Sequence, residues 1–147
     1  MELSHLDKDG AARMINVSEK AKVKRIAKAR AKILLRSETI GLIKDGLLKK
    51  GDALAVARIA GISAAKKTWD LIPLCHNIEI EHVDVNFRFV SDGIEIECNT
   101  VCTDKTGIEM EALTAVSVAA LTIYDMCKAV DKEMVIGEIG LVEKRKG

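Results

Sequence analysis

The sequence predicts an α+β domain with the split β-α-β order of a ferredoxin-like fold. Two alternating apolar and polar stretches, 83–89 and 94–99, flank a Ser-Asp-Gly turn and predict a hairpin. Another alternating stretch precedes a helical region, and a long apolar helical run follows the hairpin. The order strand, helices, strand, strand, helix, strand gives an antiparallel four-stranded sheet with helices packed on one face.

The first strand is expected at residues 26–33, where alanine and isoleucine alternate with lysine and arginine. Alanine and lysine favour helix, so a helix is the alternative; we favour the strand because periodicity is the stronger signal. Ser37 is expected to cap a short helix that ends at residues 45–46. Asp52 is expected to cap a second helix that runs to about Lys67.

A long helix is expected over about residues 108–130, followed by a last strand that Gly137 and Gly140 interrupt or bulge. Residues 112–124 carry no charge and are apolar or small on every side, so this helix must be buried all round. A four-stranded sheet covers only one of its faces. We therefore expect an oligomer; the alternative is that the helices within residues 37–67 cover it in the same chain.

The composition narrows the class of protein. The 147 residues carry a net charge of +1 and include one Trp, one Tyr and two Phe, which argues against a general nucleic-acid binder. The 13 uncharged residues fall short of the roughly 20 that span a bilayer, and the polar N-terminus does not resemble a signal peptide. We expect a cytoplasmic protein with an N-terminal arm at residues 1–12 and a single domain at residues 13–147.

Four cysteines occur without any C-x-x-C pair, so free thiols are expected rather than a metal site.

Polar groups at the element ends are the better candidates for chemistry. Lys50 precedes a helix N-terminus, which suits a phosphate, although a solvated loop is the alternative. Lys66 ends the same helix, where the helix dipole alone explains a cation. His76 lies in an apolar loop. It is either an acid, a base or a hydrogen-bond donor to a ligand, or simply a hydrogen-bonded core group.

The ends of the long helix carry the remaining candidates. Glu109 and Glu111 open it, where the helix dipole alone explains acidic residues. Asp125 and Lys128 close it and share a face, because they lie three residues apart. They form either a surface ion pair or, in a partly buried setting, a pair that transfers protons.

Taken together, the chain resembles the cyclic pyranopterin monophosphate synthase family, the molybdenum-cofactor biosynthesis protein C. The resemblance begins at His5 and includes residues 5–7, 50–52, 57–66, 71–76, 105–114 and 121–130. Asn16 and Asn77 depart from the Asp and Pro that are usual in the family. Neither change touches the candidates above, and Asn16 keeps the size and hydrogen-bonding capacity of Asp.

The resemblance implies a lyase that converts 3′,8-cyclo-7,8-dihydroguanosine 5′-triphosphate to cyclic pyranopterin monophosphate and releases pyrophosphate. It also implies a ferredoxin-like subunit in a homohexamer, a trimer of dimers with sites at the subunit interfaces. No resident cofactor or metal ligand is expected, and a magnesium ion could arrive with the substrate triphosphate. Neither a nucleic acid nor a membrane is expected as a partner.

The resemblance also assigns roles to residues of this sequence. Lys50, Asp125 and Lys128 would be catalytic, and His76 and Glu111 would bind and orient the substrate. A triphosphate needs a pocket that gathers cations, for which Arg25 and Lys66 are further candidates. The full set of expected substrate-binding residues is Leu74, Cys75, His76, Glu109, Met110, Glu111, Arg25 and Lys66.

Glu111 and Asp125 lie 14 residues apart, or about 21 Å along a continuous helix. One small substrate cannot touch both, so we expect a pocket shared between two subunits. Two other functions stay open on the residues alone. One is a ferredoxin-like binding module without catalysis, and the other is an RNA-binding domain that would stack bases on Phe87 and Phe89.

Overall fold

Four strands and four helices form the structure, a computed structural model that describes residues 6–147. The elements follow the predicted order, with a short additional helix before the hairpin. Their bounds are β1 (Val23–Leu34), α1 (Ser37–Lys44), α2 (Ala53–Lys66), α3 (Thr68–Leu71), β2 (Ile80–Val90), β3 (Gly93–Asp104), α4 (Glu109–Cys127) and β4 (Val135–Lys146).

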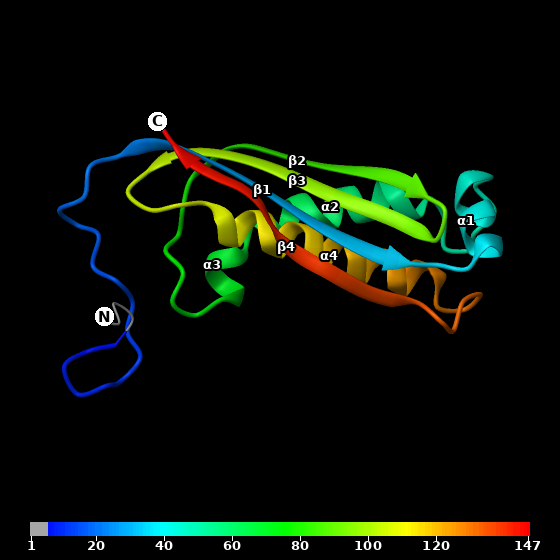
Figure 1. The fold of residues 1–147 in the computed structure, drawn as a ribbon, viewed down its shortest axis with the longest axis horizontal. Helices are drawn as coiled ribbons and strands as arrows, with labels where there is room; N and C mark the ends of the chain where they lie inside the picture. Colours follow the sequence, from blue (N-terminus) through cyan, green and yellow to red (C-terminus); the bar gives the residue numbers. More distant parts are fainter. Residues whose placement is uncertain (1–5) are drawn as a thin grey trace.

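The four strands form one sheet in the order β2-β3-β1-β4, and every neighbouring pair is antiparallel. Figure 1 shows α2 and α4 packed along one face of this sheet, with α1 at one end and α3 toward the other. The hairpin strands β2 and β3 occupy one side, and β4 forms the opposite edge. This arrangement confirms the α+β ferredoxin-like fold.

The alternating residues of β1 form a strand, as predicted. Ala27, Ala29 and Ile33 are completely buried against the helices, whereas Lys28 and Lys32 form ion pairs with carboxylates on or next to β3. Because β1 pairs with both β3 and β4, two neighbouring strands satisfy its backbone groups. This pairing outweighs the helix propensity of alanine and lysine.

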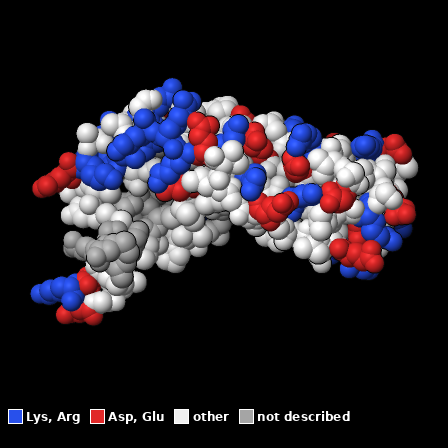
Figure 2. Space-filling model, viewed as in Figure 1, with Lys and Arg blue, Asp and Glu red and all other residues white. Residues whose placement is uncertain are grey.

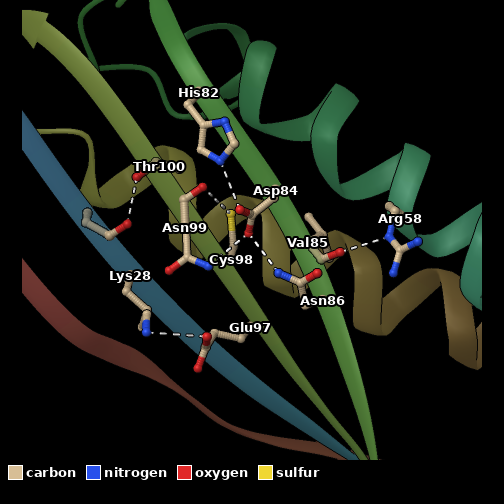
Figure 3. Close-up of polar contacts among 11 residues, drawn as sticks. Lys28, Arg58, His82, Asp84, Val85, Asn86, Glu97, Cys98, Asn99 and Thr100 are labelled. Atoms are coloured by element: carbon tan, nitrogen blue, oxygen red, sulfur yellow. Dashed lines mark hydrogen bonds and ion pairs between the residues drawn. The ribbon is translucent and has the colours of Figure 1, made fainter.

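Polar contacts join the two hairpin strands to each other and to α2 (Figure 3). Asp84 on β2 accepts a hydrogen bond from the Asn99 side chain on β3 at 2.9 Å. Arg58 of α2 donates to the Val85 carbonyl at 2.9 Å. These contacts support the register of β2 against β3 and the packing of α2 on β2.

Small residues allow α2 and α4 to approach closely. A Cβ atom on Gly61 would lie 3.0 Å from the Ala115 carbonyl oxygen and 3.4 Å from the Ala119 Cβ. By length and composition α4 could cross a membrane, but half of the relevant window is buried inside the protein. Part of its surface stays uncovered, since Leu121 is 58% exposed and Tyr124 is 39% exposed.

The predicted N-cap at Ser37 is wrong. Ser37 is the first residue of α1, and Arg36 is an N-cap without a side-chain hydrogen bond. The carboxylate of Asp131 lies there instead and accepts from the Arg36 backbone N–H at 3.0 Å and the Thr39 hydroxyl at 2.8 Å. The cap predicted at Asp52 is confirmed, because its side chain accepts from a backbone N–H in the first turn of α2.

The structure tests the prediction for the C-terminal end of the chain but not for residues 1–5. Residues 1–5, including His5, lie outside the described residues, and the division into an arm at 1–12 and a domain at 13–147 stays a prediction. The last strand is confirmed, and its register shifts against β1 mark the expected irregularity. Glu138, between the two glycines, has a φ of 52°.

Gly93 provides a test of the close contact between β3 and β1. A Cβ atom there would lie 2.0 Å from the Ile33 carbonyl oxygen. We expect Gly93→Ala to lower the free energy of unfolding by roughly 1–3 kcal/mol. The control is Gly41→Ala in α1, where a Cβ meets nothing within 4 Å and should stabilise by about 0.5–1 kcal/mol. Equal urea midpoints for the two variants would contradict the predicted contact.

Candidate active site

The chain after α3 and the first turn of α4 line a cavity of about 400 Å³. The six residues predicted from segments 74–76 and 109–111 all line it, although these segments are more than 30 residues apart. The lining consists of Leu74, Cys75, His76, Glu109, Met110 and Glu111, together with Ile15, Ile72, Ile78, Thr106 and Gly107. The structure therefore brings the main predicted binding set together in one place.

His76 is held by a residue that the sequence did not indicate. Its Nε2 donates to the Ile15 carbonyl oxygen at 2.7 Å. Because a carbonyl only accepts, the proton of a neutral imidazole lies on Nε2 and leaves Nδ1 as an acceptor. Ile15 belongs to the segment before β1, and no local pattern marks it as a partner of a residue 61 positions later.

Glu111 is a buried carboxyl group with an incomplete set of hydrogen bonds. It is 3% exposed, and its Oε1 has no hydrogen-bond partner among the described residues. Burial raises the pKa of Glu111 to about 7, the nearby Glu109 also raises it, and a backbone hydrogen bond acts in the opposite direction. Near neutral pH the group is therefore present in both forms and can donate or accept a proton.

Gly107 lies between Glu109 and Lys144, whose Oε1 and Nζ form an ion pair at 3.0 Å. A Cβ atom at Gly107 would come within 2.2 Å of the Glu109 Oε2 and 3.3 Å of the Lys144 Cε. A side chain at this position would thus displace the ion pair. Lys144 was not among the predicted residues, and it reaches this place because β4 runs back alongside β1.

A second cavity, of about 290 Å³, also has Gly107 in its lining. Its cationic lining is Arg25, Lys144, Arg145 and Lys146. Arg25 is oriented by hydrogen bonds of 3.2 Å to the carbonyl oxygens of Asp104 and Lys105. Figure 2 shows Lys and Arg side chains gathered at this end of the molecule, which suits a polyanion.

The predicted catalytic residues meet at the opposite end of α4. Lys50 Nζ lies 3.0 Å from the Asp125 carbonyl oxygen and 3.2 Å from its Oδ2, and Lys128 Nζ lies 3.0 Å from its Oδ1. Hydrogen bonds from Lys128, and then from Lys50, hold the pKa of Asp125 below its usual range. The partly buried setting expected for this pair is not found within one chain, because all three side chains are 45–57% exposed.

The two ends of α4 do not meet within one chain. Glu111 and Asp125 stay about 21 Å apart along α4, as the spacing predicts. Because Lys50 precedes α2 and contacts the end of α4, the two helices run antiparallel and Lys66 lies toward the start of α4. Lys66 is exposed and does not line the described cavities.

The four cysteines are free thiols, as predicted. Burial raises the pKa of Cys75, and the carboxylates of Glu111 and Glu109 raise it further. Cys98 and Cys127 are fully buried, and burial raises their pKa to about 12 and about 11. Cys75 therefore packs in the cavity wall as a thiol rather than acting as a thiolate nucleophile.

Comparison with known proteins places this geometry in a family. The MoaC family profile matches residues 14–147. The cyclic pyranopterin monophosphate synthase of Chloroflexus aurantiacus is 57% identical over 99% of this chain and 91% of that protein. The enzymes with the same name from Novosphingobium aromaticivorans and Peptoclostridium acidaminophilum are 58% and 56% identical, and the match covers 93% and 94% of their lengths. This chain belongs to the MoaC family.

Proposed function

We propose that this chain catalyses the cyclic pyranopterin monophosphate synthase reaction in molybdenum-cofactor biosynthesis. It converts 3′,8-cyclo-7,8-dihydroguanosine 5′-triphosphate to cyclic pyranopterin monophosphate and releases pyrophosphate, and it is thus a lyase. The observation that carries the proposal is the cavity in which segments 74–76 and 109–111 meet. The relatives' names support the same reaction.

The reaction needs acids and bases at defined positions. Opening of the purine ring and closure of the pterin ring break and form carbon–nitrogen bonds, so protons must move. Glu111, with a pKa near 7, and His76, whose Nδ1 is an acceptor in the neutral ring, bind and orient the guanine-derived part. Lys50, Asp125 and Lys128 transfer protons through their shared ion pairs. A sugar hydroxyl then attacks the α-phosphate and displaces pyrophosphate, a step that depends on alignment and charge neutralisation.

The cationic cavity beside Gly107 suits the triphosphate. Arg25 and Lys144 line it directly, and Lys66 lies toward the same end of the helical layer. The reaction transfers no net electrons, so no resident cofactor is required, and magnesium would accompany the triphosphate. We also propose a cytoplasmic location, because the GTP-derived substrate is a soluble metabolite.

The complete site requires two copies of the chain. Met110, Ser117, Leu121, Tyr124 and Lys128 follow one another at helical spacing and form a stripe on α4. Leu121 and Tyr124 in this stripe are large and exposed. If two α4 helices pack antiparallel across a two-fold axis near Val118, Glu111 of one copy faces Asp125 of the partner subunit. Such a dimer covers the stripe and builds two identical shared sites.

The hexamer is a further step of the proposal. Three of these dimers would form it, as the family resemblance implies. Exposed apolar side chains away from α4, including Val135, Ile139 and Val142 on the edge strand β4, would favour additional contacts between dimers.

The proposed activity can be tested directly. Purified protein is incubated with the cyclised GTP intermediate, and the product is oxidised and detected by pterin fluorescence. We expect Lys128→Ala to lower turnover by at least about 100-fold, in the range for loss of a general acid or base. Lys49→Ala, next to Lys50 and also exposed, is the control and should keep normal turnover. Absence of any pterin from active wild-type protein would refute the proposed reaction.

The shared site predicts that two inactive variants complement each other. A 1:1 mixture of Lys128→Ala and Glu111→Ala gives half heterodimers, each with one intact site and one doubly altered site. After subunit exchange, the mixture should therefore regain about a quarter of wild-type activity. No recovery, despite exchange verified by mass spectrometry, would contradict the shared site.

Glu111 should make stability depend on pH. Its folded-state pKa of about 7 lies above the ordinary value of 4.5, so the folded protein binds this proton more tightly. The stabilisation is complete below about pH 4.5 and is lost as pH rises through 7. Glu111→Gln stays neutral, so its stability relative to wild type should increase by roughly 2–4 kcal/mol between pH 5 and 8.

The measurement is thermal unfolding at both pH values, with the exposed Glu79→Gln as the control. A difference between Glu111→Gln and wild type that is the same at pH 5 and pH 8 would show that Glu111 titrates normally.

A further inference from the structure

Asp131 is a buried carboxylate just beyond α4 with no role in the proposed chemistry. It is 1% exposed. Its Oδ2 accepts from the Arg36 backbone N–H at 3.0 Å and from the Thr39 hydroxyl at 2.8 Å, and its Oδ1 accepts from the Glu133 backbone N–H at 2.9 Å. The Arg36 guanidinium lies 3.6 Å from Oδ1. Burial raises the pKa of Asp131, but the hydrogen bonds outweigh this effect and keep it below the ordinary value.

These contacts fix the turn that carries Lys128. The backbone N–H groups of Val130 and Asp131 both donate to the Cys127 carbonyl at 3.0 Å, so the turn closes directly after α4. The Arg36 side chain also donates to the Val130 carbonyl. Lys128 is the C-cap of α4 and lies inside this closed turn, so its backbone position depends on where Asp131 is held.

The same carboxylate is bonded to the start of α1, and the chain that leaves α1 carries Lys50. Thr39 and Ile40 in α1 and Leu48 after it are buried, which couples this segment to the core. The ion pairs of Lys50 and Lys128 with Asp125 are exposed. Exposed ion pairs contribute about 0–1 kcal/mol, which is too little to align two separate segments. The alignment must come from a buried connection.

We propose that Asp131 is a positioning residue, which aligns Lys50 and Lys128 around Asp125 by joining the end of α4 to the start of α1. This inference rests on the proposed function, since it assigns Asp131 to the half of the shared site that Lys128 supplies. If Asp131 only stabilised the fold, its replacement would impair both the Glu111 end and the Lys128 end that one subunit supplies to the shared sites.

Complementation distinguishes the two roles. We expect Asp131→Asn to lower kcat about 10- to 100-fold, the range for a catalytic group displaced by up to 1 Å. In 1:1 mixtures, Asp131→Asn should regain activity with Glu111→Ala, whose lysine half is intact, but not with Lys128→Ala. Thr39→Val, which removes one hydrogen bond to Asp131, should lower kcat less and should complement the same partner variant. Glu133→Gln is the control and should keep wild-type kcat, because Glu133 contributes only its backbone N–H.

A second measurement does not depend on the shared site. Carboxyl ¹³C NMR of the free protein should show the pKa of Asp125 returning toward its ordinary value in Asp131→Asn, but not in Glu133→Gln. Wild-type kcat in Asp131→Asn, or an unchanged pKa of Asp125, would overturn the inference. If the mixture of Lys128→Ala and Glu111→Ala regains no activity while the pKa of Asp125 rises in Asp131→Asn, the shared site is rejected and the role of Asp131 is retained.

Discussion

The length and rigidity of α4 determine where chemistry can take place in this protein. The helix is held along the sheet by small residues that pack against α2, so it can neither bend nor shorten to bring its ends together. Its first turn lines a cavity with a buried carboxyl group, and its last turn carries an exposed carboxylate between two lysines. A substrate that needs both ends must bind between two copies of the chain.

The two ends of α4 shift the pKa of a carboxyl group in opposite directions. At Glu111, burial favours the neutral form and raises the pKa to about 7, and Oε1 has no partner within residues 6–147. At Asp125, two ammonium groups favour the charged form and lower the pKa. In the shared site that we propose, a group that can release a proton at neutral pH would lie across from one that stays ionised. Two acidic residues of one helix thereby acquire different chemical properties, set by their environments alone.

Most of the fold could be predicted from the sequence because its signals are local. The alternation in β1, the turn before Gly93 and the cap at Asp52 each involve residues within one element or its immediate end. Their positions in an apolar loop and at a helix start marked His76, Glu109 and Glu111 as candidates, but only the family resemblance grouped segments 74–76 and 109–111 in one site, since nothing local shows that they meet. The false cap at Ser37 and the missed partner Ile15 share one cause: the groups that form these contacts lie 61 or more residues away.

Distant contacts of this kind also bear on how the three exposed side chains proposed to be catalytic can be held in place. Lys50, Asp125 and Lys128 lie at the surface, where ion pairs are weak and side chains move freely. We infer that buried contacts behind them supply this order, and Asp131 joins the end of α4 to the start of α1 beside the hydrogen bond from Arg36 to the Val130 carbonyl. Burying an ionised group is unfavourable unless every oxygen is bonded, and here both oxygens are. Asp131, with both oxygens bonded, thus lies beside the proposed catalytic lysine, whereas Glu109 and Glu111, each with one buried oxygen that has no partner among the described residues, lie at the cavity.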